Sequence, residues 1–231
     1  MAATGEERQV RKTIAAARAL AASQLEAIFV ERLYENVPPF DLANLDADAL
    51  YAAAHEFLDH GRSRPGRKPK IRVTNPAYMK SRANGRAAHT VVEILNDDMP
   101  FLVDSVTAEI NRLGLTVHLV IHPILKVKRD KNGRLRDILP EDTDEAGARA
   151  ESWMRVEVDQ HTSAETVSAL KAGLENVLAD VGHAVEDWQP MLGKAREIID
   201  ELTVRPPNLP DDDIDEARAF LNWLADDNFT L

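Results

Sequence analysis

One apolar stripe at helical spacing runs through residues 5–36, which predicts a single long helix near the start of the chain. Thr4 and Glu7 have the spacing of a capping box, in which each side chain accepts a hydrogen bond from the other residue's backbone. The proline pair at 38–39 ends the pattern because proline lacks the N–H that a helix interior uses. A second stripe from Asp46 to Asp59 predicts another helix, so residues 1–62 are expected to form an N-terminal helical segment.

The stretch GRSRPGRKPKIR, residues 61–72, is the most basic part of the chain. Its glycines, prolines and arginines predict an exposed linker, and charge runs of this kind are usually solvated. The alternative is that the run contacts an acidic partner or a phosphate. With a short strand at 71–74, we expect a basic linker segment over residues 63–87.

From residue 88 the apolar spacing alternates between strand and helix periods. Strands are predicted at 89–96, at 115–128 with a bend near Pro123, and at 152–159, and helices are predicted at 101–113 and before Gly182. The Asn-Gly pair at 132–133 predicts a hairpin turn. In the strand at 152–159, Met154, Val156 and Val158 are expected to face the core, and Arg155, Glu157 and Asp159 the solvent.

This order predicts an α+β domain over residues 88–182, in which the helices cover one face of a mainly antiparallel sheet. A new helix is expected at 184–203, and the prolines at 206, 207 and 210 separate it from a last helix that starts at 211–213. Residues 183–231 thus predict C-terminal helices that lead to a downstream domain missing from this sequence.

Composition narrows the classes of function. The chain has 231 residues, 39 acidic against 28 basic side chains and a formal charge of −11, which argues against nucleic-acid or anionic-membrane binding. It has no cysteine, so disulfides and thiolate chemistry are excluded. No apolar run approaches the about 18 residues of a membrane span, and the N-terminus lacks a secretory signal, so a cytoplasmic location is expected.

The chemical motifs of common enzymes are missing from the sequence. No G-x-G-x-x-G, no phosphate-binding loop and no G-x-S-x-G occurs. His118 and His122 share one face of a predicted strand, but four strand residues span about 13 Å, which is too far for one metal ion. We therefore expect no catalytic residue, no bound cofactor and no metal ligand in this chain.

The turn NDDMP, residues 96–100, is the strongest candidate for a functional site. Asp98 has the chemistry of a helix cap, and proline is tolerated in the first helical turn. The alternative is that the same turn faces a small polar ligand, whose charged ends its free amides and carboxylates would hold. The residues predicted for such a ligand site are Asp97, Asp98, Pro100, Phe101, Asp104 and Gly114.

The run NDDMPFLVDSVTAEINRLGLTVHLVIHPILKVKRDKNGRL, which begins at residue 96, resembles the N-terminal region of the large bacterial NAD-specific glutamate dehydrogenases. The stretches LYENVPPFDLANLDADALYAAAHEFLDH and EARAFLNWLADDNFTL are similar to the same region. The resemblance implies a non-catalytic N-terminal part of an oligomeric enzyme whose NAD-binding core lies far downstream. The parent would oxidise L-glutamate to 2-oxoglutarate and ammonia.

The same segment is also similar to ACT domains, regulatory units of βαββαβ order with a ferredoxin-like fold that often sense amino acids. Residues 98–104, DMPFLVD, match in part the motif that precedes their first helix, with Phe101 where these domains commonly have glycine. No strand is predicted after the second helix. The resemblance implies an amino-acid effector, and two other hypotheses stay open: a stand-alone amino-acid-binding module and a purely structural assembly domain.

Overall fold

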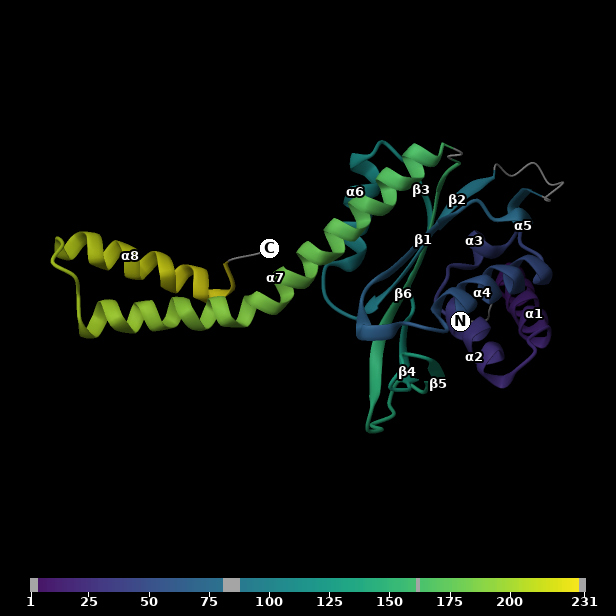
Figure 1. Cartoon of the computed structure of the whole chain (residues 1–231), viewed down its shortest axis with the longest axis horizontal. Helices are drawn as coiled ribbons and strands as arrows, with labels where there is room; N and C mark the ends of the chain where they lie inside the picture. Colours follow the sequence, from purple (N-terminus) through teal and green to yellow (C-terminus); the bar gives the residue numbers. More distant parts are fainter. Residues whose placement is uncertain (1–3, 81–87, 161–162, 229–231) are drawn as a thin grey trace. The chain divides into compact units, whose positions relative to one another are not determined.

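The computed structural model describes residues 4–80, 88–160 and 163–228. Part of the predicted linker, 81–87, lies outside the described residues. The chain forms two compact units, Met1–Leu178 and Ala179–Leu231. The first unit holds the sheet and most of the helices, and Figure 1 labels its elements.

The N-terminal helices of the first unit are α1 (Gly5–Ala19), α2 (Gln24–Tyr34), α3 (Pro39–Leu42) and α4 (Ala47–Gly61). The capping box at the start of α1 is confirmed, because Thr4 Oγ1 accepts from Glu7 N at 3.2 Å and the Glu7 carboxylate accepts from Thr4 N at 2.8 Å. The predicted single helix over 5–36 is wrong. The helix α1 ends at its cap residue Leu20. A new helix, α2, follows Ser23, whose side chain accepts a hydrogen bond from Glu26 N.

Six strands of the described residues form one antiparallel sheet: β1 (Lys70–Thr74), β2 (His89–Asp97), β3 (Val117–Ile121), β4 (Ile124–Arg129), β5 (Leu135–Leu139) and β6 (Ala148–Asp159). The long strand β6 lies at its centre, with β2 on one side and both β3 and β4 on the other. Pro123 divides the predicted strand 115–128 into β3 and β4, and its carbonyl still accepts from Trp153 N at 3.1 Å. The strand β6 begins at Ala148, four residues before the predicted start at residue 152.

The remaining helical elements are η1 (Pro65–Arg67), α5 (Ala77–Lys80), α6 (Leu102–Arg112), α7 (Ala164–Val204), α8 (Asp211–Trp223) and η2 (Leu224–Asn228). The predictions for α4 and α6 are confirmed, and Gly114 follows α6 with a φ of 74° that suits glycine. The expected break at Gly182 is wrong, since α7 is one continuous helix with Pro190 inside it. In the second unit, Ile214 of α8 is buried.

The βαββαβ order ends with a strand that the sequence did not predict, and β1 takes the place of that strand in the sheet. It pairs antiparallel with the outer side of β2, with Ile71 opposite Ile94 and Val73 opposite Val92. A strand that followed α7 would need this same edge. The edge is therefore filled by a segment that precedes the unit in sequence, and the predicted α+β architecture is complete without a final strand.

Both faces of the sheet are covered by helices (Figure 1). Side chains alternate along a strand, so Leu95 and Trp153 point to α1–α4 while Ile94 and Met154 point to α6 and the first part of α7. An aromatic cluster forms on the first of these faces, where Trp153 lies 4.8 Å from Phe29 between ring centroids. The helices that were expected on one face are thus joined by the N-terminal helices on the other.

Because helices cover both faces of the sheet, one prediction about β6 is wrong. Arg155 and Glu157 were expected to face the solvent, but Arg155 is 1% exposed and Glu157 is 9% exposed. The alternation itself is correct. The side that was taken as solvent is the side that α1–α4 and α5 cover, so its charged groups are buried within the protein.

Candidate functional site

The predicted ligand turn between β2 and α6 is organised by its backbone. The residue that precedes α6 is Phe101, with a φ of 69° and no side-chain hydrogen bond to the helix. The prediction that Asp98 caps α6 is therefore wrong. Pro100 lies just before the helix, and the ring of Phe101 is 47% exposed.

A left-handed backbone is costly for a residue with a side chain, by roughly 1–2 kcal/mol. Phe101 thus occupies a conformation that glycine adopts freely, which agrees with its place in the DMPFLVD motif. Its exposed ring contributes little burial to offset that cost. Such an outlier marks this turn as a candidate for function rather than for stability.

The other predicted site residues do not gather around the turn. Asp98 donates its backbone N–H to the Ala150 carbonyl at 3.2 Å, and Asp104 is exposed in the first turn of α6. Gly114 lies at the far end of the same helix. Asp97 belongs to a different group of side chains, since it forms ion pairs with Arg64 and Arg67.

Those two arginines come from the segment that was expected to be a solvated linker, and for Arg64 that expectation is wrong. Its guanidinium is 1% exposed and donates to Asp97 at 2.7 Å and to Glu151 at 3.1 Å. Its Nε donates to the Lys68 carbonyl at 2.9 Å and its Nη2 to the Arg67 carbonyl at 2.6 Å. The backbone of Arg64 also pairs with Gly133 of the β4–β5 hairpin. The segment is thus part of the folded unit.

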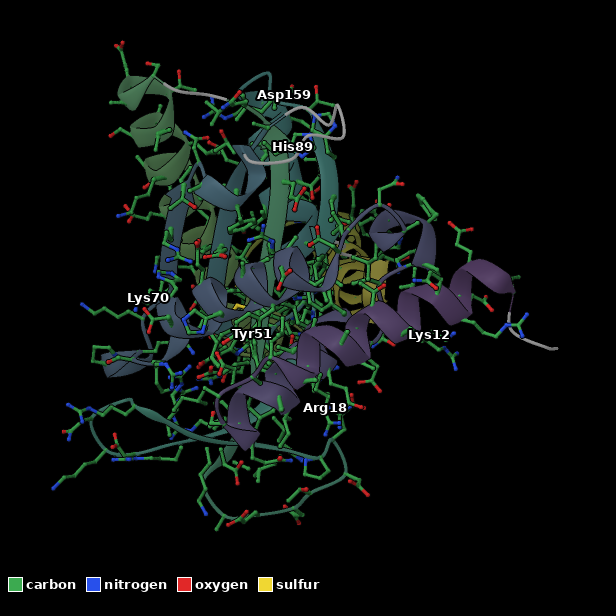
Figure 2. All side chains as sticks on the ribbon, turned by 90° about the vertical axis from the view of Figure 1, so that its right-hand side faces the viewer. Lys12, Arg18, Tyr51, Lys70, His89 and Asp159 are labelled. Carbon is green, nitrogen blue, oxygen red and sulfur yellow. The ribbon has the colours of Figure 1, made fainter. Side chains whose placement is uncertain are left out.

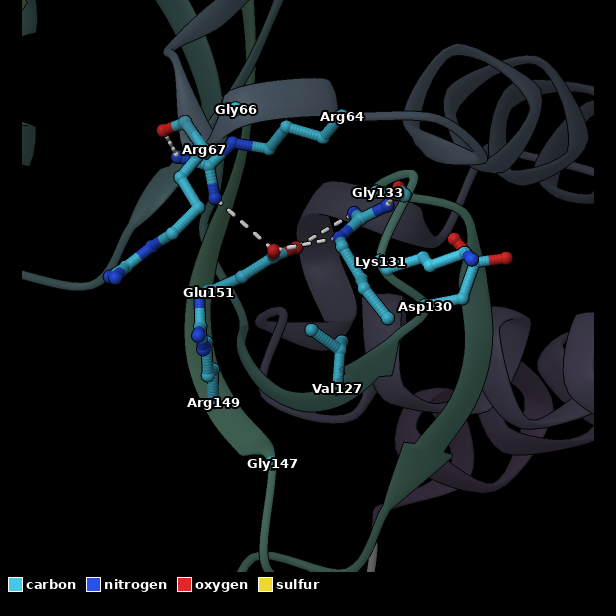
Figure 3. Close-up of a pocket in the computed structure, with 11 residues that line it drawn as sticks. Arg64, Gly66, Arg67, Val127, Asp130, Lys131, Gly133, Gly147, Arg149 and Glu151 are labelled. Atoms are coloured by element: carbon cyan, nitrogen blue, oxygen red, sulfur yellow. Dashed lines mark hydrogen bonds and ion pairs between the residues drawn. The ribbon is translucent and has the colours of Figure 1, made fainter.

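Glu151 of β6 is the centre of this arrangement, which we call the Glu151 network (Figure 3). Arg129 donates two hydrogen bonds of 2.8 Å to the Glu151 carboxylate. Its third nitrogen donates to the carbonyls of Gly61 and Gly133. Such bidentate pairs fix geometry as well as charge. Burial opposes ionisation of Asp97, but its hydrogen bonds from Arg64 and Arg67 hold the pKa of that carboxyl below its usual value.

A cavity of about 350 Å³ opens beside the Glu151 network. It is lined by Arg64, Gly66, Arg67, Val127, Arg129, Asp130, Lys131, Gly133, Gly147, Arg149 and Glu151. We call it the basic cavity, because five of these side chains are cationic and two are acidic. Sequence reasoning found the basic run at 61–72 but not the hairpin and β6 residues that complete the cavity.

A second buried group, the Glu93 network, lies farther along the same face of the sheet. Arg155 donates to Glu93 at 2.9 Å, to Tyr78 Oη at 2.9 Å and to Glu157 at 3.4 Å. Arg72 donates to the second oxygen of Glu93 at 2.8 Å and reaches the Glu56 carbonyl of α4. Burial opposes the charge on Arg155, but Tyr78, Glu93 and Glu157 hold its pKa above the usual value.

The two histidines of the predicted pair, His118 and His122, have separate partners. His118 Nε2 lies 2.7 Å from Asp159 Oδ1, and His122 Nε2 lies 2.7 Å from Ser152 Oγ. The ring of His118 stacks on that of His89 at 4.4 Å between centroids, and Figure 2 shows His89 beside Asp159. Within the described ranges, no three histidine or acidic side chains are close enough to share a metal ion.

Comparison with known proteins bears on these observations. A family model described as the glutamate dehydrogenase ACT1 domain matches residues 29–174. The chain is 40% identical over 205 residues to the NAD-specific glutamate dehydrogenase of Halomonas elongata. The aligned residues make up 88% of this chain and 12% of that enzyme.

Two more distant relatives carry the same description. The NAD-specific glutamate dehydrogenase of Pseudomonas aeruginosa is 38% identical over 164 residues, 71% of this chain and 10% of the enzyme. The Mycobacterium tuberculosis enzyme is 27% identical over 141 residues, 61% of this chain and 9% of the enzyme. The chain thus spans about a tenth of the length of the relatives it matches.

Proposed function

The chain belongs to the glutamate dehydrogenase ACT1 domain family, and we propose that it is the N-terminal, non-catalytic region of an NAD-dependent glutamate dehydrogenase. The observation that carries the proposal is the family match over residues 29–174, which includes the whole sheet, α3 to α6, and parts of α2 and α7. In the proposed parent, L-glutamate, NAD and water give 2-oxoglutarate, ammonia and NADH, and NAD binds in a downstream domain.

We further propose that this region serves regulation or subunit contact in a cytoplasmic homo-oligomer. The domain boundaries expected from the sequence, 1–62, 63–87, 88–182 and 183–231, remain part of the proposal. Its partners would be the downstream domains and an amino-acid effector, with neither nucleic acid nor membrane. No helix in the described parts of the chain is long and apolar enough to cross a membrane.

The non-catalytic role is tested with the isolated chain. It is incubated with L-glutamate and NAD, and NADH is followed by its absorbance. We expect no glutamate-dependent NADH above a protein-free control. Turnover that rises in proportion to the chain's concentration would overturn the proposal.

The two proposed roles give different results in light scattering and thermal melting of the isolated chain. A dimer or larger assembly supports subunit contact. A monomer whose melting temperature rises with an amino acid supports regulation. A monomer that no amino acid in a full panel stabilises contradicts both roles.

Amino-acid binding at the β2–α6 turn is a second candidate function, favoured by the exposed ring and left-handed backbone of Phe101. Phe101→Gly removes the ring and relieves the backbone, whereas Phe101→Ala removes only the ring. If the turn binds an amino acid at its backbone, Phe101→Gly strengthens binding more than Phe101→Ala does. Equal affinity of wild type and both variants in calorimetric titration places the effector elsewhere.

A further inference from the structure

We propose that the basic cavity is a binding site for a small polyanion that carries at least two phosphate or carboxylate charges. The proposal rests on the cavity's lining and not on the enzymatic role of the parent. A volume of about 350 Å³ lies within the usual range of small-molecule sites, roughly 300–1,000 Å³. Such a space is too small for a folded partner and large enough for a compact anion.

The local charge of the cavity is opposite to that of the whole chain. Five cations line it against Asp130 and Glu151, in a protein whose formal charge is −11. Asp130 is already occupied, because its carboxylate accepts from Arg136 and from the backbone of Asn132 and Arg134. Glu151 is likewise fully engaged by Arg64 and Arg129. The acidic side chains therefore do not satisfy the remaining cations.

The buried arginines build the wall of the cavity and do not bind the ligand themselves. Each nitrogen of Arg64 and of Arg129 already donates to a carboxylate or a backbone carbonyl. They are held in place and cost no further ordering when a ligand enters. Asp97 and Glu151 balance the charges of these two arginines, so the positive potential of the cavity comes from its exposed cations.

The ligand contacts come from the exposed cations. Lys131 and Arg149 are exposed, and neither has an ion-pair or hydrogen-bond partner on its side chain among the residues the structure describes. Arg67 is 60% exposed at its side chain and pairs with Asp97 through one nitrogen. The three come from η1, the β4–β5 turn and β6, so they approach one space from separate elements.

The geometry favours a polyanion over a single charge. A guanidinium presents a planar fork that matches phosphate and carboxylate oxygens, and lysine supplies a point charge. Three such groups with few competing carboxylates are matched by a ligand with two or more negative charges. Pyrophosphate and citrate have these features and represent the two chemical sources.

The test is calorimetric titration of the 231-residue chain with pyrophosphate and, separately, with citrate, at a fixed ionic strength of about 0.15 M. Lys131→Gln/Arg149→Gln is compared with the control Arg11→Gln/Lys12→Gln, which makes the same charge change on the exposed side of α1. We expect at least one probe to bind wild type and the control equally. Lys131→Gln/Arg149→Gln should bind it about tenfold more weakly or worse.

Each result has a defined meaning. Binding of pyrophosphate alone identifies a phosphate ligand, and binding of citrate alone identifies a polycarboxylate. Failure of both probes to bind wild type, or equal weakening in the control, overturns the proposal. All four substituted residues are exposed, so both variants should keep the wild-type melting temperature. The titration contains neither glutamate nor NAD, so its outcome is independent of the proposed enzymatic role.

Discussion

The two faces of the sheet are buried by different chemistry. Against α6 and α7, the adjacent strands β2 and β6 present apolar side chains such as Ile94, Met154 and Val156. Against α1–α5, the same two strands present Glu93 and Arg155 beside the aromatic ring of Trp153. Neighbouring residues of one strand therefore belong to two kinds of core.

This difference predicts which face of the sheet tolerates amino-acid substitution better. Apolar packing is non-directional and accepts side chains of similar volume, whereas a buried ion pair needs its own partner in one geometry. The charged face also holds both networks and the basic cavity. The following substitutions test this comparison from the largest expected effect to the smallest.

The largest effect is expected from two adjacent residues of β6. Arg155→Met removes one cationic partner from buried Glu93 and from Glu157, which should lower the free energy of unfolding by about 3–5 kcal/mol. Met154→Leu keeps the volume on the apolar face and should cost less than about 1.5 kcal/mol. Urea unfolding of both variants against wild type measures the difference.

A double variant sharpens the same comparison. If the loss comes from breaking the buried Glu93–Arg155 ion pair, Glu93→Leu/Arg155→Met should lose less stability than the sum of the two single substitutions. Equal losses for Arg155→Met and Met154→Leu would contradict the distinction between the faces.

A smaller effect is expected from one glycine on each side of the sheet. A Cβ on Gly61 would overlap the ring of Trp153, so Gly61→Ala should cost about 1–3 kcal/mol through overpacking. A Cβ on Gly173 of α7 would meet only the end of the flexible Glu109 side chain. Since alanine favours a helix interior by about 1 kcal/mol, Gly173→Ala should be close to neutral.

Melting temperatures of the two variants check this prediction. A larger loss for Gly173→Ala than for Gly61→Ala would show that the aromatic cluster is the more adaptable of the two layers.

The smallest effect concerns pH. Burial, with the charges of Lys70 and Arg72, lowers the pKa of His60 from 6.5 to about 4. Between these values the unfolded chain binds the proton more tightly, so stability is complete above pH 6.5 and falls as the pH drops toward 4. Because the imidazole is partly exposed, solvent screening reduces the effect to on the order of 1 kcal/mol.

His60→Leu removes this contribution from the pH dependence. Unfolding by urea at pH 7 and pH 4.5 should show a smaller loss for the variant than for wild type. An identical loss in both proteins would mean that His60 does not contribute to the pH dependence of the charged face.

Much of the local structure could be predicted because its signals lie within a few residues. The capping box at Thr4, the start of α4 at Asp46 and the glycine after α6 all follow from hydrogen bonds close in sequence. The break before α2 carried a signal too, since Ser23 and Glu26 repeat the Thr4–Glu7 spacing. That signal was masked by an apolar stripe that continued across it.

The candidate sites were predicted less well. The resemblance to ACT domains put Phe101 where those domains commonly have glycine, and the structure gives Phe101 a positive φ. The burial of Arg64 had no local signal, because its carboxylate partners lie 33 and 87 residues away, at Asp97 and Glu151. The basic composition of residues 61–72 was visible, but the partners that bury its central arginine were not.

The sequence by itself determined the α+β class, the alternation of side chains in β2 and β6, and the family to which the chain belongs. Only the tertiary structure decided which side of β6 meets which helices, and hence that Arg155 and Glu157 are buried. The physical reason is that a period of two fixes which residues share a face, but not what covers that face. Burial depends on elements far away in sequence, and their packing brings distant charges into contact.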